Sequence, residues 1–114
     1  MRGLFGKGVS KYHAKKTVVG DKKFDSKKEA ERFVELTLME KAKVIQDLKT
    51  QVAFPLIAKS RWGREIKYVA DFTYYEDGIL VVEDVKSSIT KKNPVYRLKK
   101  RMFNERYQKE IRET

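Results

Sequence analysis

The sequence of 114 residues contains no cysteine and a single histidine, His13. The lack of cysteine excludes disulfides, thiol catalysis, iron–sulfur clusters and every cysteine-based zinc site. A serine–histidine–aspartate triad has only His13 as a candidate base, and the basic segment around His13 is more typical of a tail than of an active site. Any catalysis is therefore expected to use carboxylates, lysines and a hard metal ion.

Long hydrophobic runs are also missing. The longest covers residues 53–58, well below the roughly 20 residues that a membrane span requires. The first residues carry charge but lack the apolar segment of a signal peptide. These absences predict an intracellular chain that does not enter a membrane.

Positive charge is abundant and uneven. Lysine and arginine total 27 against 16 acids, which gives a net charge of +11. Residues 1–20 and 85–104 contain no acid, and like charges grouped in this way usually contact a polyanion such as nucleic acid. Plain solvated charge is the alternative. We expect a flexible basic arm over residues 1–16, and DNA contacts from a subset of the cations Lys11, Lys15, Lys16, Lys91, Lys92, Arg97, Lys99 and Lys100.

The order of secondary structure indicates an α/β fold. A small hairpin is expected around Gly20-Asp21 and a helix after Asp25-Ser26. A strand over residues 49–58 is expected at a sheet edge, or bent, because it contains Pro55. Strands over 66–75 and 79–86 follow, then a helix that begins at Asn93-Pro94. Residues 107–114 either extend this helix or form a last strand that buries Ile111, and the strand is preferred. Residues 17–114 are expected to form a single domain with a mixed sheet.

Several apolar residues are assigned to the core by their spacing. The stripe of the first helix comprises Ala30, Phe33, Val34, Thr37, Leu38 and Ala42, and that of the second comprises Val95, Leu98, Met102 and Phe103. Trp62 and the tyrosines at 68, 74 and 75 are expected in the core or in hairpin pairs. An exposed ring that stacks on an unpaired base is the alternative.

The Asp77-Gly78 dipeptide predicts a type I′ hairpin turn. Paired residue numbers then sum to 155, so Asp71 faces Asp84, and Lys86 lies on the same face opposite Val69. Opposed carboxylates repel and are costly to bury. A frayed strand end or an ion pair between Lys86 and Asp84 would tolerate them, and so would a divalent cation between them.

Such a patch has a definite chemistry. Oxygen ligands suit Mg²⁺ or Mn²⁺, which would polarise a phosphate oxygen and lower the pKa of a bound water. Lys86 would orient or deprotonate that water and offset negative charge in the transition state. On a basic chain, this combination points to phosphodiester hydrolysis.

Residues 68–72 and 81–86, Tyr-Val-Ala-Asp-Phe and Val-Val-Glu-Asp-Val-Lys, resemble the signature of the PD-(D/E)XK nuclease superfamily. In that signature an aspartate ends one strand, and an acid-X-lysine triplet lies on the next. Ala70 stands where the superfamily usually has its proline. Only Asp84 lies two residues before Lys86, so Glu83 is expected to point to the opposite layer.

The resemblance extends further. Residues 24–30 resemble the first-helix motif whose glutamate, here Glu29, completes the site, although Ser26 and Glu29 also form a capping box. The run over 11–101 is similar to a small phage-encoded family catalogued as a domain of unknown function. The resemblance implies a restriction-endonuclease-like core of helix, three strands, helix and strand around a mixed sheet.

The resemblance also implies a site. The implied catalytic residues are Glu29, Asp71, Asp84 and Lys86; the implied metal ligands are Asp71, Asp84, the backbone carbonyl of Val85, and Glu29 through water. The cofactor would be Mg²⁺, with Mn²⁺ as a substitute. The implied protein is a homodimeric DNA endonuclease in the cytoplasm of the bacterial host, acting on branched DNA such as Holliday junctions. The alternatives are a non-catalytic nucleic-acid-binding phage protein and a sequence-specific nuclease.

Overall fold

The computed structural model describes residues 17–114; the expected basic arm, with Lys11, Lys15 and Lys16, lies outside them. The chain forms two compact units, one that ends at Leu38 and one that runs from Met39 to Thr114. Within the described residues, no helix is both long and apolar enough to cross a membrane.

The described part of the first unit begins with a small hairpin. Strands β1 (Thr17–Val19) and β2 (Lys22–Phe24) pair antiparallel, and Gly20 in the turn has a φ of 61°, so the hairpin prediction is confirmed. Helix α2 (Lys27–Lys41) follows, with the Glu29 amide donating to Ser26 Oγ at 3.1 Å, which confirms the cap.

The predicted stripe of α2 is partly wrong. The buried residues of this helix are Glu29, Ala30 and Leu36, whereas Val34 and Leu38 are exposed. Leu36 lies two residues from each of them, and that spacing places it on another side of the helix.

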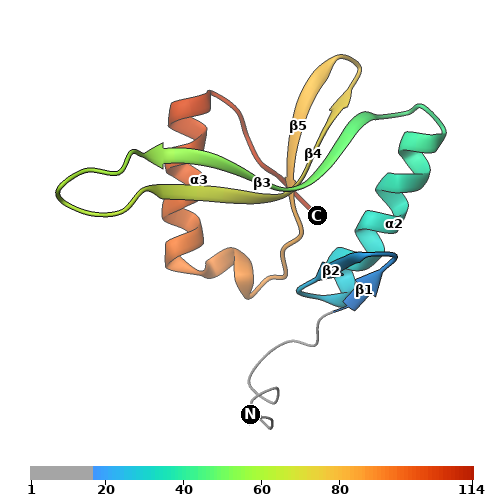
Figure 1. The fold of residues 1–114 in the computed structure, drawn as a ribbon, viewed down its shortest axis with the longest axis horizontal. Helices are drawn as coiled ribbons and strands as arrows, with labels where there is room; N and C mark the ends of the chain where they lie inside the picture. The colour runs from blue at the N-terminus through green and yellow to red at the C-terminus, as the bar shows by residue number, and fades with distance from the viewer. Residues whose placement is uncertain (1–16) are drawn as a thin grey trace, which may run out of the picture. The chain divides into compact units, whose positions relative to one another are not determined.

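The second unit contains a four-stranded mixed sheet in the order β3-β4-β5-β6 (Figure 1). The first three strands are antiparallel, and β5 pairs parallel with β6. Strand β3 lies at the edge, as Pro55 predicted. The α/β class with a mixed sheet is therefore confirmed. The strands are β3 (Gln46–Ile57), β4 (Ile66–Glu76), β5 (Ile79–Asp84) and β6 (Arg112–Glu113).

The 3₁₀ helix η2 (Thr90–Lys92) leads into α3 (Pro94–Tyr107). The Asn93 side chain accepts a hydrogen bond from the Tyr96 amide at 3.0 Å, and Pro94 occupies the first turn, which confirms the predicted start. The helix ends at Tyr107, so the preferred last strand is confirmed, although β6 has only two residues.

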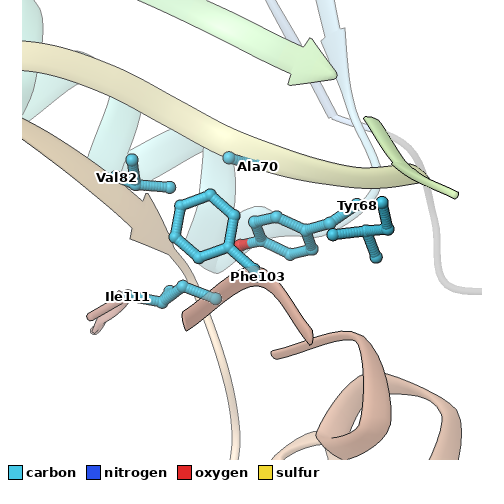
Figure 2. Packing of buried hydrophobic residues seen from close by; sticks show 6 residues of the cluster. Tyr68, Ala70, Val82, Phe103 and Ile111 are labelled. Carbon is cyan, nitrogen blue, oxygen red and sulfur yellow. The ribbon is translucent and has the colours of Figure 1, made fainter. Parts of the chain in front are cut away.

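The core of the second unit is built around Phe103 of α3. Its ring lies among Tyr68, Ala70, Val82 and Ile111 (Figure 2). The ring centroids of Phe103 and Tyr68 are 5.3 Å apart. Burial of Ile111 confirms another prediction.

The predicted stripe of α3 is only half correct. Its last turns supply Phe103 and the partly buried Met102 to the core, but Val95 and Leu98 are 62% and 61% exposed. These two side chains line an open apolar hollow of about 550 Å³ that also includes Ile57 and Ile66.

The hairpin of β4 and β5 has the predicted register. Asp77 and Gly78 have φ values of 53° and 76°, as a type I′ turn requires. Every pair in the ladder sums to 155, from Glu76 with Ile79 to Phe72 with Glu83.

The ladder ends sooner than predicted. Strand β5 stops at Asp84, so Lys86 is not paired with Val69. Just beyond the last pair, the amides of Asp71 and Val85 donate to carboxylate oxygens. They are therefore engaged by side chains at the point where the ladder stops. The Lys86 amide donates to the carbonyl of Thr114 at 2.9 Å.

Candidate active site

Strand β4 changes its face beside the predicted site. Ala70 packs in the Phe103 core together with Val82 of β5, but Val82 is paired with Thr73. Paired residues share a face of the sheet, and successive residues alternate. On β4 the side chains that point toward Phe103 therefore have even numbers up to Ala70 and odd numbers from Thr73. The regular alternation of side chains along the strand must be interrupted around Asp71.

The neighbouring strand is distorted at the same level. Gln51 of β3 has a φ of 54° and lies between the pairs Thr50 with Phe72 and Val52 with Ala70. A non-glycine residue in this left-handed region is uncommon. Gln51 is exposed, as is usual for a glutamine at the surface.

Asp71 and Asp84 are interlocked through the backbone. The Asp71 amide donates to Asp84 Oδ1 at 3.1 Å, and the Val85 amide donates to Asp71 Oδ2 at 2.9 Å. The Tyr68 hydroxyl donates to Asp84 Oδ2. Asp84 is only 2% exposed, so these donors replace much of the hydration that burial removes. The two predicted acids are thus brought together.

The Tyr68 hydroxyl is the hydrogen-bond donor to the buried Asp84 carboxylate. Burial raises the pKa of the Tyr68 hydroxyl far above its ordinary value, and the negative charge of Asp84 raises it further. The hydroxyl therefore stays protonated at any physiological pH. It fixes one side of the Asp84 carboxylate.

Lys86 is fixed at both ends. Its Nζ lies 3.9 Å from Asp84 Oδ2 and 4.2 Å from the centroid of the Tyr96 ring. A cation over an aromatic face is attracted by the ring quadrupole. With its amide bound to Thr114, Lys86 has its backbone and its ammonium group both held in place.

Tyr96 is in turn oriented by an acid of β6. Its hydroxyl donates to Glu113 Oε2 at 2.6 Å, and Lys100 Nζ lies 3.2 Å from the same oxygen. Burial raises the pKa of Tyr96, and the bond to Glu113 adds to this. Burial also raises the pKa of Glu113, but the bonds from Tyr96 and Lys100 outweigh it, so that pKa is lowered.

Glu83 contacts a different set of groups. Its carboxylate accepts hydrogen bonds from Tyr74 and from Thr114 Oγ1. Arg112 donates to both the Tyr74 hydroxyl and Glu76. The tyrosine that binds Glu83 thus differs from the one that binds Asp84, which agrees with the expected opposite direction of Glu83.

An open hollow of about 380 Å³ lies at Asp84 and Lys86. Tyr68 and Tyr96 form part of its wall, and its cations include Lys67 and Lys99 in addition to Lys86. Lys99 was predicted to contact DNA. Lys67, Tyr96 and Glu113 were missed, and no short motif marks them.

A second basic hollow, of about 290 Å³, contains three of the predicted DNA-binding residues, Lys91, Arg97 and Lys100, together with Arg101 and Glu113. Lys100 is already paired with Glu113, so less of its charge is available to a phosphate. Lys92 is exposed in η2 and lines neither basic hollow.

The donor set fits a hard divalent cation. Mg²⁺ typically binds through one or two carboxylates together with waters and substrate phosphates, and Asp71 and Asp84 supply two. Across residues 17–114, no group of three or more histidine, cysteine or acidic side chains gathers in a way that could hold a metal. Glu29 belongs to the first unit, and its role stays a prediction. So does that of the Val85 carbonyl.

A family model described as "Protein of unknown function (DUF1064)" matches residues 9–114. The chain therefore belongs to this family. The search of curated proteins gave no match, and neither did the search of solved structures.

Proposed function

We propose that the chain is a Mg²⁺-dependent DNA endonuclease of the PD-(D/E)XK type. The observation that carries the proposal is that Asp84 and Lys86 line one open, cation-lined hollow, with the Lys86 ammonium 3.9 Å from Asp84 Oδ2, while Asp71 is interlocked with Asp84 through two backbone amides. Two adjoining carboxylates, one of them at an accessible hollow beside a lysine, match the needs of phosphodiester hydrolysis.

Asp71 and Asp84 would hold Mg²⁺, or Mn²⁺ in its place, with the Val85 carbonyl as a further ligand; the resemblance adds Glu29, acting through water. The bound ion supplies a Lewis acid that polarises a phosphate oxygen. Tyr68 keeps the Asp84 carboxylate oriented. Lys86 offsets the negative charge that develops on the phosphate and orients the attacking water, while Tyr96 keeps its ammonium at the hollow.

The substrate is proposed to be branched DNA such as a Holliday junction, cut by a homodimer in the cytoplasm of the bacterial host. These finer points rest on the resemblance of residues 68–86 to the superfamily. The net charge of +11 supports a polyanionic substrate. Lys67 and Lys99 at the hollow would bind the phosphates beside the one that is cut.

The test is a cleavage assay on duplex, single-stranded, flap and four-way DNA, with and without Mg²⁺. Lys86→Ala should slow single-turnover cleavage about 10²- to 10⁴-fold and leave DNA binding nearly unchanged. Lys49→Ala is the matched control, because the Lys49 side chain is 63% exposed and belongs to neither basic hollow. If no substrate is cut with any divalent metal ion, the nuclease proposal is refuted.

The second basic hollow favours a separate candidate function, a non-catalytic nucleic-acid-binding protein. If Lys91 and Arg97 bind phosphates there, replacing both with alanine should lower the log–log salt slope of duplex binding by about 0.9 for each phosphate that is no longer neutralised. Under the nuclease proposal, cleavage at saturating protein should change little. An unchanged salt slope would show that these two residues are only solvated charge.

A further inference from the structure

The tip of the loop between β3 and β4 is closed by hydrogen bonds of its own backbone. Ser60 and Gly63 exchange two backbone hydrogen bonds, of 3.0 and 3.2 Å, and the Trp62 amide donates to Ser60 Oγ at 3.1 Å. In Figure 1 this loop extends beyond the ends of both strands. The backbone that presents Trp62 is therefore held in a defined shape.

Trp62 is 82% exposed, more than any other large hydrophobic residue among those described. The prediction that it belongs to the core or to a hairpin pair was wrong. The guanidinium carbon of Arg61 lies 4.4 Å from the centroid of its ring. One face of the indole is thus occupied by a cation, while most of the side chain remains accessible.

The surroundings of the ring are basic. Lys59, Arg61 and Arg64 flank it, and Glu65 is the one acid over residues 58–67. Lys67 follows on β4 and lines the hollow at Asp84. Lys67 follows Trp62 by five residues, and five residues of extended chain span at most about 17 Å. Trp62 and the hollow at Asp84 are therefore separated by no more than about five base-pair steps of DNA, at 3.4 Å each.

An aromatic ring among cations matches a nucleobase among phosphates. Every base has a π face, and stacking on exposed aromatic side chains is a general means of binding single strands. The bases of a continuous duplex are stacked on one another and do not offer that face. The core of a protein interface is likewise enriched in tryptophan and arginine but is depleted of lysine, so Lys59 and the net charge of +11 favour a nucleic acid over a protein.

We propose that Trp62 stacks on an unpaired base, while Lys59, Arg61 and Arg64 hold the flanking phosphates. This tip would select DNA with unpaired nucleotides over continuous duplex. As a statement about which substrate the Asp84 hollow receives, the inference rests on the proposed nuclease function. As a statement about binding, it stands separately.

Trp62 is the single tryptophan of the chain, so intrinsic tryptophan fluorescence reports on this tip alone. The full chain would be titrated, without divalent metal, with a single-stranded oligonucleotide, a flapped duplex and a continuous duplex of equal length. We expect quenching by the first two and little by the third. Trp62→Ala should weaken binding to the single strand and the flap roughly 5- to 150-fold, and to duplex less than about twofold.

Two variants serve as controls. Trp62→Phe retains a ring and should recover most of the affinity that Trp62→Ala removes. Ile89→Ala removes a side chain that is also highly exposed, at 81%, but is not aromatic and lies outside the tip, so it should change nothing. An equal decrease of affinity in both alanine variants would overturn the inference.

Three further results would overturn it: equal quenching by all three DNAs, quenching by none, or emission that changes with protein concentration alone, which would place Trp62 against a second copy. The two proposals fail separately. Cleavage of branched DNA by wild type, with unaltered DNA binding by Trp62→Ala, would refute the role of the tip and keep the nuclease. Quenching without cleavage under Mg²⁺ or Mn²⁺ would refute the nuclease and keep the tip.

Discussion

Glu83 and Asp84 are neighbours in β5, and both are buried acids, 0% and 2% exposed, that accept a hydrogen bond from a tyrosine hydroxyl. Their surroundings differ. Glu83 is held by Tyr74 and Thr114 and lines neither basic hollow. Asp84 lines the larger one and lies beside Lys86.

The comparison shows that burial and a tyrosine partner do not by themselves mark a catalytic acid. Both features are also found where a buried carboxylate serves only the fold, because a hydrogen-bond donor replaces part of the hydration that burial removes. What sets Asp84 apart is the second carboxylate interlocked with it and the access that the hollow gives. Glu83 has the properties of a structural acid, and Asp84 has those that the proposed nuclease requires.

The most direct test of the difference between Glu83 and Asp84 is to neutralise each acid in turn. Asp84→Asn should lower single-turnover cleavage by at least about 10²-fold and keep or tighten DNA binding, because it removes a metal ligand and a charge that repels phosphate. Glu83→Gln should cleave at nearly the wild-type rate once folded. Loss of cleavage in Glu83→Gln alone would reverse the assignment.

A smaller effect is expected from the two tyrosines. Tyr68→Phe removes the donor that orients Asp84 and should reduce the cleavage rate about tenfold. Tyr74→Phe removes the donor to Glu83 and should reduce the unfolding free energy by about 1 to 3 kcal/mol, without altering cleavage by the folded protein. The measurements are single-turnover rates and urea unfolding for both variants. An equal decrease of the cleavage rate in both variants would contradict the different roles assigned to Asp84 and Glu83.

The smallest effect concerns alkaline pH. Burial, with the hydrogen bond to Glu83, raises the pKa of Tyr74 to about 12. The folded-state pKa is above the unfolded value, so its contribution to stability is complete below about pH 10 and is lost as pH rises toward 12. Between pH 10 and 12 the unfolding free energy of wild type should fall more steeply than that of Tyr74→Phe. Parallel curves would contradict the coupling.

The centre of the site was predictable because a local signal determines it. The Asp77-Gly78 turn sets the register, and the register brings Asp71 toward Asp84. The prediction that Lys86 lies opposite Val69 was wrong, because the ladder of paired residues stops at Glu83 and Lys86 lies beyond the end of β5.

Other features depend on contacts that no local pattern encodes. Tyr96 meets Lys86 only because α3 packs where it does, and Glu113 reaches Tyr96 from the last strand. Helical periodicity assigned Val95 and Leu98 to the core, although Tyr96 is the residue of the first turn of α3 that packs against it. An apolar stripe predicts which side chains could be buried, not which side of the helix faces the rest of the core.

The two-residue turn also acts as a ruler for the hairpin. Asp71 and Asp84 lie 13 residues apart, with arms of equal length on either side of the turn. Deleting one residue from a single arm would bring Glu83 or Val85 opposite Asp71, whereas deleting two from each arm would shorten the hairpin and keep the aspartates facing each other. The hairpin therefore keeps the aspartates opposed only when its two arms change in length equally. Relatives of this chain should be sought by the number of residues between each aspartate and the turn, rather than by which residues lie there.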